Sequence, residues 1–538
     1  MPSPVLLSDA QVQQFICDGY LVLQPSVNPN IHKVIDEKFS WLAEHEKNPG
    51  NNITARLPEL NAIIESPEVR GAMISLLGED YITIPHRFWH FREAGKHGIF
   101  GGDDEEEFRK KSAKQIIGER SHQDGYCPSS TGKSHALQYL RFMYYSHDMT
   151  LENGPTHIAP ATQYNATVSD EDRERQIPVI GKAGTVFISH FDLVHAGSPN
   201  KSDRVRNMIK FLFTRKQNMQ SPSWDHTSAK WKTPEQHSSP YQIENIWEQQ
   251  WNWLCNQASN SSKNSLNENF EEPKPNLSTK EMVSFIQNIG KQPKAINFLM
   301  SQLNTTHQAV RSSAIYALGT IGKDAVEPLV RAIKQSEAPG DTYERLAGNC
   351  ITISDESHAL NACGEHALDS ISQLLEEKNA WIQINALHLI SDSGQSNDKI
   401  EAAVLQCLKS EFDIVVSFAA ITIGRIGNKK SIPYLLDLFN TKYSPENFDL
   451  MVNKLSPNAW PNEWVIHFNA ALSLLRLADQ ADEYEANISE LLEHPFGQVS
   501  ILIAECLKVI GTTSALRRLV DFYHIRRWDD SICAQKSF

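Results

Sequence analysis

The second half of the chain repeats one phrase, in which an apolar helical stretch ends at a glycine and a second stretch follows with a proline in its first turn. One copy spans 317–329 and a later copy spans 423–435. The turn positions recur about every 33 to 35 residues. They are occupied by Gly322, Gly394, Gly427, Ala478 and Gly511. A helix pair of this length cannot bury its apolar face alone, so we expect the copies to stack into an all-α solenoid.

This phrase resembles the short HEAT-like repeats of phycobilisome (PBS) lyase-type arrays. The resemblance implies about six units over 280–538, of which the third is degenerate, with an insertion at 438–463. Arrays of this kind mostly bind a protein partner or brace a neighbouring domain. The preceding residues, 256–279, are rich in Asn, Ser, Glu, Lys and Pro and are predicted to form a linker.

Residues 1–255 follow a different pattern and are predicted to form a separate domain. From residue 80 onward, short runs rich in β-branched and aromatic residues alternate with turn residues, as in an all-β sandwich or barrel. These runs are 81–91, 137–145, 185–189 and 208–214, and helices are expected at 9–18, 31–48 and 67–78. The Gly-rich and acidic stretch at 93–120 is expected to be a solvated loop and helix, with a mobile lid as the alternative.

Composition narrows the classes of partner. The net charge of −14 and the lack of any basic run argue against binding to nucleic acid. No apolar run is long enough to span a membrane, and the N-terminus lacks the basic region of a secretory signal. The 8 cysteines are scattered without a Cys-x-x-Cys pair, which is typical of reduced thiols and predicts a cytoplasmic protein. We expect a small-molecule substrate and, through the solenoid, a protein as a further candidate partner.

One pattern indicates a metal site. His122 and Asp124 are two positions apart, so on an extended chain they face the same side. With His195 they would supply two imidazoles and one carboxylate, the set that binds one face of ferrous iron and leaves the other face open. A second His-x-Asp pair, His190 and Asp192, lacks a suitable histidine and arginine after it. The first pair is therefore the candidate.

An arginine follows the last histidine of this set. A turn-rich segment at 196–200 separates His195 from Arg206, which enters an apolar run. A hairpin would bring Arg206 beside the iron, where its planar fork could hold the far carboxylate of 2-oxoglutarate. Arg204 is the competing candidate for this role.

Residues 1–220 resemble phytanoyl-CoA dioxygenase-like Fe(II)/2-oxoglutarate oxygenases. The resemblance is carried by four segments, which are 7–23, 122–124, 152–162 and 184–200. It implies an all-β double-stranded β-helix core, of the jelly-roll or cupin-like kind, with flanking helices. The whole chain would then be multidomain, with the HEAT-like solenoid after this core. Ala161-Thr162-Gln163 departs from the family pattern, which has a glycine and ends in histidine there.

The resemblance also implies an activity and its site residues. The chain would be a non-haem Fe(II)- and 2-oxoglutarate-dependent dioxygenase that uses O2 to hydroxylate, or otherwise oxidise, a C–H bond of a small organic substrate, with secondary metabolism as one setting. The metal ligands and catalytic residues would be His122, Asp124 and His195, and the co-substrate contacts would be Arg206, Tyr126, Asn153 and Thr156. The carboxylate of Asp124 argues against the halogenating branch of the family.

Two of the predicted strands carry side chains that would line the barrel or form part of its wall. Tyr139, Arg141 and Met143 alternate along one predicted strand and would line the barrel, while His86 and His90 would form a polar part of its wall. The alternative function is a partner-binding scaffold, in which the solenoid recruits a protein that the oxygenase domain modifies.

Overall fold

The computed structural model describes residues 2–46, 48–96, 106, 109–124, 134–257, 270–337, 352–443 and 462–526. Contacts divide the chain into two compact units. The first unit comprises Met1–Asp124, Lys133–Leu329 and His358–His366, and the second comprises Gly125–Gly132, Val330–Ser357 and Ala367–Phe538. In the described part of the chain, no helix is both long and apolar enough to cross a lipid bilayer.

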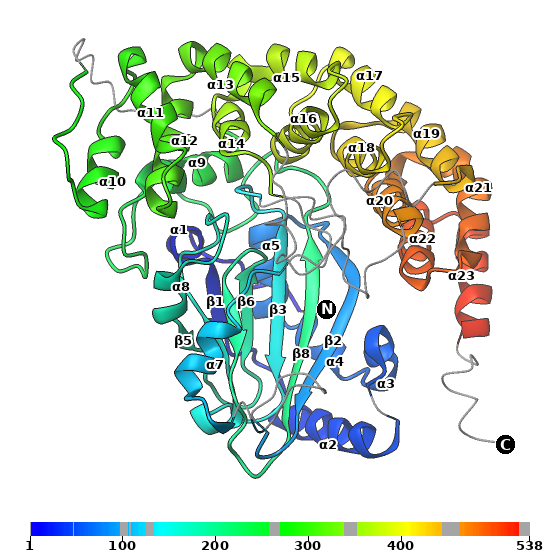
Figure 1. The fold of residues 1–538 in the computed structure, drawn as a ribbon. Helices are drawn as coiled ribbons and strands as arrows, with labels where there is room; N and C mark the ends of the chain where they lie inside the picture. Colours follow the sequence, from blue (N-terminus) through cyan, green and yellow to red (C-terminus); the bar gives the residue numbers. More distant parts are fainter. Residues whose placement is uncertain are drawn as a thin grey trace. The chain divides into compact units, whose positions relative to one another are not determined.

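Two antiparallel sheets form the core of the first unit (Figure 1). The larger sheet has the strand order β1 (Tyr20–Leu23), β6 (Val186–His190), β3 (Tyr139–Tyr145), β8 (Arg206–Thr214) and β2 (Ile82–Arg92). The smaller sheet has the order β5 (Ile177–Pro178), β4 (Thr156–Ile158) and β7 (His195–Gly197). The jelly-roll class predicted from the sequence is confirmed, and all four predicted strands form.

Alternation along the strands gives the larger sheet two different faces. The inner face contributes side chains such as Met143, Phe187 and Met208 to a buried apolar cluster, which Ile158 of the smaller sheet also joins. The outer face packs on helices: on this side the ring of Phe39 stacks on Trp89 with centroids 4.9 Å apart. The space between the two sheets is therefore the place where polar inner side chains can gather.

The three predicted helices are present as α1 (Asp9–Asp18), α2 (Pro29–His45) and α5 (Pro67–Leu77). The second begins earlier than expected because Asn28 caps it and Pro29 fits its first turn. The remaining helices of this part are α3 (Ile53–Arg56), α4 (Leu60–Ile64), α7 (Ala113–Glu119), α8 (Asp170–Glu174) and α9 (Glu244–Leu254). Most of the predicted lid segment, at 97–105 and 107–108, lies outside the described residues.

The first helices of the repeat region belong to the same compact unit as the sheets. These are α10 (Thr279–Gln287), α11 (Ile296–Gln302), α12 (Gln308–Ile321) and the first part of α13 (Lys323–Gln335). The hydroxyl of Tyr316 on α12 lies 2.8 Å from Nδ1 of His135, and the ring of His135 stacks on His358 with centroids 4.1 Å apart. All three side chains are buried, so α12 packs tightly on the segment that precedes β3.

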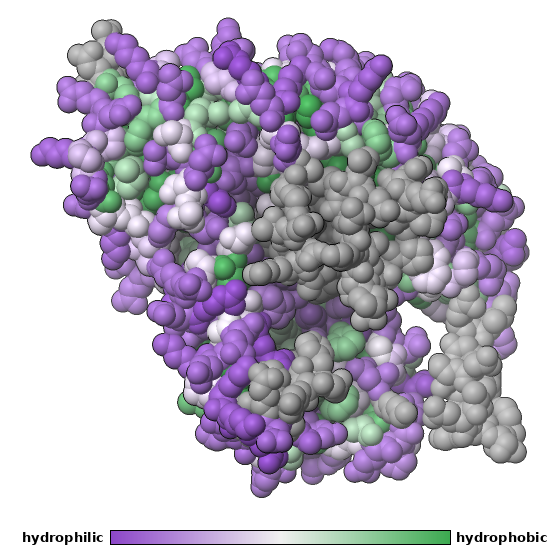
Figure 2. Space-filling model, viewed as in Figure 1, coloured by the Kyte–Doolittle hydropathy of each residue, from purple (hydrophilic) through white to green (hydrophobic). Residues whose placement is uncertain are grey.

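The second unit is a run of stacked helix pairs. Its helices are α15 (Leu368–Leu375), α16 (Ala380–Ser393), α17 (Asp398–Cys407), α18 (Asp413–Ile426), α19 (Ile432–Asp437), α20 (Asn462–Arg476), α21 (Glu485–Glu490), α22 (Gly497–Ile510) and α23 (Thr513–Arg526), while α14 (Asp355–Ala362) spans both units. Helices α16, α18, α20 and α22 pack in succession, as a solenoid requires. Many side chains on the visible face of this part are hydrophilic (Figure 2).

The glycines of the repeat phrase lie where the helices end. Gly322, Gly394 and Gly511 follow α12, α16 and α22 with φ of 73°, 64° and 67°, a conformation that favours glycine. Gly427 caps α18 without a positive φ. The predicted all-α solenoid is confirmed. Most of its predicted insertion, at 444–461, lies outside the described residues.

A partly exposed hydrogen-bond cluster ties the start of α1 to the segment before α9. The carboxylate of Asp9 accepts hydrogen bonds from Nε1 of Trp224 at 2.7 Å, from the amide and hydroxyl of Thr227 at 2.9 and 2.7 Å, and from the amide of Ser228 at 2.9 Å. Burial alone would raise the pKa of Asp9, but the hydrogen bonds from Thr227 and Trp224 outweigh it and hold the pKa well below its usual range.

We predict that Asp9→Asn lowers the free energy of unfolding by about 2 kcal/mol at neutral pH, because a neutral amide accepts fewer and weaker hydrogen bonds. The folded pKa is depressed, so the difference from the wild type is fully present above the unfolded pKa near ~4 and shrinks as pH falls toward the folded pKa. Urea unfolding at several pH values measures it. The control Asp225→Asn changes an exposed carboxylate and should have little effect; an equal loss in both variants would contradict the prediction.

Candidate metal centre

Three side chains from two distant segments converge between the sheets. His122 and His195 form an antiparallel bridge, in which the amide of each donates to the carbonyl of the other at 3.0 and 2.9 Å. Nε2 of His122 lies 3.5 Å from Oδ1 of Asp124, and Nε2 of His195 lies 3.6 Å from its Oδ2. One ligand atom from each of the three residues lies within 4.8 Å of the others. This spacing suits a single metal ion.

Backbone carbonyls orient both imidazole rings. Nδ1 of His122 lies 2.8 Å from the carbonyl oxygen of Arg120, and Nδ1 of His195 lies 3.1 Å from that of Leu193. A carbonyl oxygen can only accept, so each contact places the ring proton on Nδ1 and leaves the Nε2 lone pair facing Asp124. Two Nε2 atoms and a carboxylate fit Fe(II), so the donor set is chemically suited to the predicted ion.

Burial is uneven across the three residues. Asp124 and His195 are buried, whereas 46% of the side chain of His122 is exposed. Burial, followed by the charge of Arg141, lowers the pKa of His195 well below its usual range, so this imidazole is neutral at physiological pH. A neutral imidazole can bind a metal without first losing a proton.

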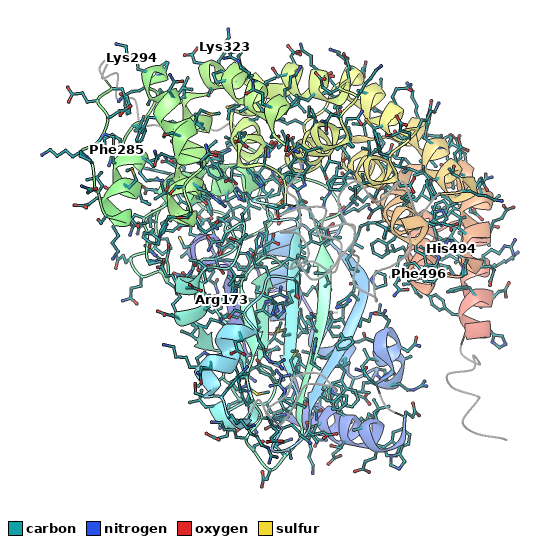
Figure 3. The ribbon with its side chains drawn as sticks, viewed as in Figure 1. Arg173, Phe285, Lys294, Lys323, His494 and Phe496 are labelled. Carbon is teal, nitrogen blue, oxygen red and sulfur yellow. The ribbon has the colours of Figure 1, made fainter. Side chains whose placement is uncertain are left out.

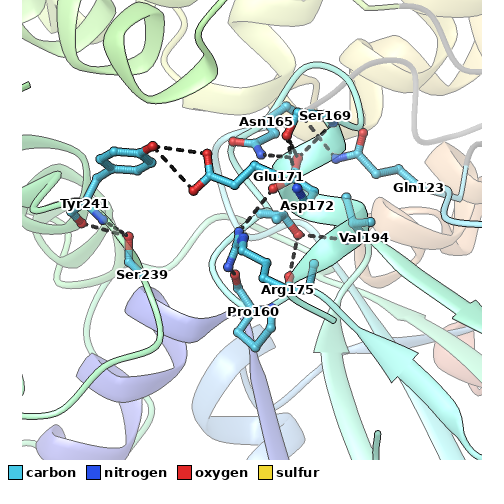
Figure 4. A network of polar contacts seen from close by, with 12 residues as sticks. Gln123, Pro160, Asn165, Ser169, Glu171, Asp172, Arg175, Val194, Ser239 and Tyr241 are labelled. Atoms are coloured by element: carbon cyan, nitrogen blue, oxygen red, sulfur yellow. Dashed lines mark hydrogen bonds and ion pairs between the residues drawn. The ribbon is translucent and has the colours of Figure 1, made fainter. Parts of the chain in front are cut away.

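Gln123, which lies between His122 and Asp124, holds this segment in place through hydrogen bonds on the side away from the triad. Gln123 points away from the triad, and its Nε2 donates to the carbonyls of Asn165 at 3.0 Å and Asp192 at 2.8 Å. Nδ2 of Asn165 in turn donates to Asp172 at 3.1 Å, and Arg175 pairs with Asp172 at 3.2 Å (Figure 4). The segment 122–124 is therefore fixed by the loop before α8.

Helix α8 also contacts α7, the helix that precedes His122. Arg173 of α8, labelled in Figure 3, donates from Nη1 to the carbonyl of Gly118 in α7 at 2.6 Å. Helix α7 ends at Glu119, three residues before His122. This bond limits how far the end of α7, and the histidine after it, can move.

Two cationic side chains surround the carboxylate of the triad. Nη2 of Arg141 lies 2.8 Å from Oδ2 of Asp124, and Nζ of Lys210 lies 3.5 Å from the same oxygen. Burial would raise the pKa of Asp124, but Arg141 and then Lys210 outweigh burial and hold it well below its usual range. The carboxylate therefore stays ionised, which is the form that binds a metal.

The sequence interpretation included Arg141 but missed Lys210. Arg141 faces inward with Tyr139 and Met143, as the alternation along β3 predicts. Lys210 is the one charged residue of the apolar run 208–214, and it shares the inward side of β8 with Arg206 and Met208. A lysine at an inward position of a buried strand was the signal that could have identified it.

Arg206 is buried in a position that suits an anionic ligand. Its Nε donates to the carbonyl of Gly154 at 3.1 Å and its Nη1 to that of His90 at 3.4 Å, while no carboxylate among the described residues pairs with it. Burial lowers its pKa. Arg204, the competitor, is 43% exposed and forms an ion pair with Asp36 at 2.6 Å. Of the two arginines, Arg206 is the one directed into the protein.

The expected hairpin between His195 and Arg206 is not formed. Strand β7 lies in the smaller sheet and β8 in the larger one, so the residues between them cross from one sheet to the other. The turn residues at 196–200 predict that the chain changes direction, but they do not specify which sheet the next strand joins. The turn after His195 instead packs against Gly154. The approach is close, because a Cβ added at Gly154 would lie 2.7 Å from the carbonyl oxygen of Ser198.

The other predicted co-substrate contacts occupy different surroundings. Asn153 is engaged in its own loop, because its Oδ1 accepts from the amide of Thr150 at 3.0 Å and its Nδ2 donates to Ser202 at 3.1 Å. Thr156 is buried beside Met143 and Tyr145, on the side where the sheets face each other. Tyr126 lies outside the described residues.

The two histidines of β2 lie near the same charges. Burial, with the charge of Lys210, lowers the pKa of His86 to about 3, and burial with Lys210 and Arg206 lowers that of His90 well below its usual range. Neither joins a cluster of metal-ligating side chains in the part of the chain that is described. A polar barrel wall, as expected, agrees with both observations.

Comparisons with known proteins agree with these features. Residues 104–208 match the family model for phytanoyl-CoA dioxygenase (PhyH), and residues 310–335 match that for the PBS lyase HEAT-like repeat. The predicted resemblances to this oxygenase family and to a HEAT-like repeat are confirmed at these residues, and the first match supports a non-haem oxygenase. The residues matched by the PhyH model include the triad and Arg206. No curated protein matches the chain.

Several solved structures are similar to part of the chain. One is the non-heme alpha ketoglutarate dependent carbocyclase SnoK from nogalamycin biosynthesis, with 16% identity over 40% of this chain and 88% of that one and a TM-score of 0.30. Another is EctD from S. alaskensis with bound Fe, with 16% identity over 40% and 79% and a TM-score of 0.30. The low TM-scores give these similarities no weight for function.

A backbone strain in the segment after β4 gives a test of the local geometry. Ala161 stands where the family pattern has glycine, and it adopts φ of 61° while its amide donates to the carbonyl of Asp18 at 2.9 Å. We predict that Ala161→Gly raises the free energy of unfolding by about 1 kcal/mol, because glycine adopts this conformation without a steric cost. Thermal or urea unfolding measures the change.

The matched control is Ala159→Gly, at a buried alanine nearby that lacks a positive φ. Here glycine loses a methyl contact and gains chain entropy on unfolding, so the free energy of unfolding should fall by about 1 kcal/mol. A loss of similar size in both variants would show that Ala161 is not strained.

Proposed function

We propose that this protein is a non-haem Fe(II)- and 2-oxoglutarate-dependent dioxygenase that oxidises a C–H bond of a small organic substrate. The observation that carries the proposal is the convergence of His122, Asp124 and His195, whose ligand atoms lie within 4.8 Å of one another. The match of residues 104–208 to the PhyH family model supports the same class of enzyme. Hydroxylation is the proposed outcome, because it is the usual reaction of this family.

The side chains divide the work of such a site. Asp124 and the Nε2 atoms of His122 and His195 would hold iron, which with O2 and 2-oxoglutarate would supply the oxidant for the C–H bond. Carbonyl oxygens keep both rings in the metal-binding tautomer, and Arg141 and Lys210 keep Asp124 ionised. The protein thus fixes the orientation and the charge of the three metal-binding side chains before the metal or the co-substrate binds.

Arg206 is the proposed anchor for the co-substrate. A buried guanidinium that no carboxylate of the described residues pairs with is costly, and a bidentate carboxylate relieves that cost. The distal carboxylate of 2-oxoglutarate is the anion that this enzyme class would supply. Thr156, and also Asn153 and Tyr126, remain proposed as further contacts, and Thr156 is supported by its position between the sheets.

The repeat array is proposed to brace the oxygenase part. We retain the division into an oxygenase domain at 1–255, a linker at 256–279 and a solenoid at 280–538. The bracing role is supported by the buried contact between Tyr316 and His135, to which Gln250 adds a hydrogen bond with the Tyr316 hydroxyl at 3.4 Å. The cytoplasmic location and a role in secondary metabolism stay predictions from the sequence.

Ligand-dependent stabilisation tests the proposal directly. We predict that Fe(II) raises the Tm of the full chain under anaerobic conditions and that 2-oxoglutarate raises it further, since a ligand at about 100 times its Kd adds about 2.7 kcal/mol to the folded state. His122→Ala and Asp124→Ala should remove both shifts. Differential scanning calorimetry measures them, and a wild type that responds to neither ligand would overturn the proposal.

Arg206 can be separated from the metal ligands in the same assay. We predict that Arg206→Gln keeps the shift with Fe(II) but binds 2-oxoglutarate at least about tenfold more weakly, because it lacks the charged fork. The control Arg204→Gln removes the exposed neighbour and should bind both ligands as the wild type does. If Arg204→Gln weakened 2-oxoglutarate binding and Arg206→Gln did not, the assigned role would belong to Arg204.

A further inference from the structure

Arg141 and Lys210 form a cationic pair next to the proposed metal. They come from the neighbouring strands β3 and β8, and the register that sets Met143 opposite Lys210 puts both side chains on the inner face. Both approach Oδ2 of Asp124, at 2.8 and 3.5 Å. Arg141 is fully buried and Lys210 nearly so. Two cations held this close repel one another unless an anion lies between them.

Asp124 can serve as that anion only while its charge is available. A bound Fe(II) would draw on the same carboxylate, and the two negative charges of 2-oxoglutarate would be shared between the metal and Arg206. Arg206 would be engaged by the distal carboxylate. Arg141 and Lys210 would then share Asp124 with the metal, and buried cations are costly unless an anion compensates them.

The tautomer of His195 points to the same need. Nη1 of Arg141 lies 3.3 Å from Nδ1 of His195, but that nitrogen also lies 3.1 Å from the carbonyl of Leu193. When Nε2 binds a metal, Nδ1 must carry the proton, so it cannot accept from Arg141. The remaining acceptor of Nη1, Ser189 Oγ, is at 3.5 Å, and Nε of Arg141 has no acceptor among the described residues.

We propose that Arg141 and Lys210 bind an oxyanion of the substrate, a carboxylate or a phosphate. The substrate class would then be a small acidic molecule, whose charged group is held by this pair while a carbon atom faces the metal. The inference rests on the proposed function, because it is metal binding that frees the pair from Asp124. Arginine and lysine together suit both oxyanions, since one offers a fork and the other a mobile point charge.

Small anions test the subsite in the full chain loaded with Fe(II) and saturating 2-oxoglutarate in the absence of O2. The probes are acetate, inorganic phosphate and the uncharged acetamide, titrated by calorimetry and by the visible charge-transfer absorption of the Fe(II) complex with 2-oxoglutarate. We expect acetate or phosphate to bind at least about tenfold more tightly than acetamide. Lys210→Met and Arg141→Gln should each abolish that preference, measured at Fe(II) and 2-oxoglutarate concentrations raised until the variant is saturated with both, because either substitution also removes a cation that keeps Asp124 ionised.

Several controls keep the result interpretable. Arg204→Gln should keep the anion preference, since this exposed arginine pairs with Asp36. If Arg141→Gln does not fold, Arg141→Lys takes its place; it retains the charge without the fork, so it should weaken the anion preference, and the full loss is then expected of Lys210→Met. Equal binding of acetamide and the anions, or anion binding that survives both substitutions, would overturn the inference, because the pair would then only position Asp124. A wild type that takes up neither Fe(II) nor 2-oxoglutarate would instead overturn the proposed function, and this is seen before any probe is added.

Discussion

The site depends on the two backbone hydrogen bonds between His122 and His195. They join a segment that follows α7 to a strand of the smaller sheet, so two ligands far apart in sequence take one fixed separation. The ring orientations follow from neighbouring backbone carbonyls, and Gln123 ties the same segment to the loop before α8. The geometry of the ligand set is therefore built mainly by the backbone, and the side chains need only the correct rotamers.

Electrostatics then sets the chemical state of these ligands. Burial alone would favour a protonated Asp124, and Arg141 with Lys210 reverses that tendency. The same positive charges oppose protonation of His195. The inner face of the larger sheet thus carries a cationic row, with Arg206 and Lys210 on one strand and Arg141 on the next, opposite the smaller sheet that supplies His195. An acidic co-substrate would bind Arg206 in that row, and an acidic substrate would bind Arg141 and Lys210.

Much of this arrangement could be predicted from local patterns. Runs rich in β-branched and aromatic residues, bounded by turn residues, predicted β2, β3, β6 and β8, and the His-x-Asp spacing with a distant histidine identified the three residues that converge. Long-range pairing could not be predicted: turn residues after His195 indicated a change of direction but not a change of sheet. Lys210 was missed because a lone lysine in an apolar run has no periodic signal, and its importance depends on the strand register that places it beside Asp124.

The contact between Tyr316 and His135 has a consequence for how the molecule is divided. The boundary of the compact unit does not coincide with the point in the sequence where strands are followed by helical repeats. The unit that holds the sheets continues to Leu329. A chain cut after residue 255 would leave the buried His135 without the Tyr316 hydroxyl and would uncover Tyr164, whose ring lies edge-on to His135. The first repeat thus packs on the segment that precedes β3, and it completes the interior of the unit that holds the sheets.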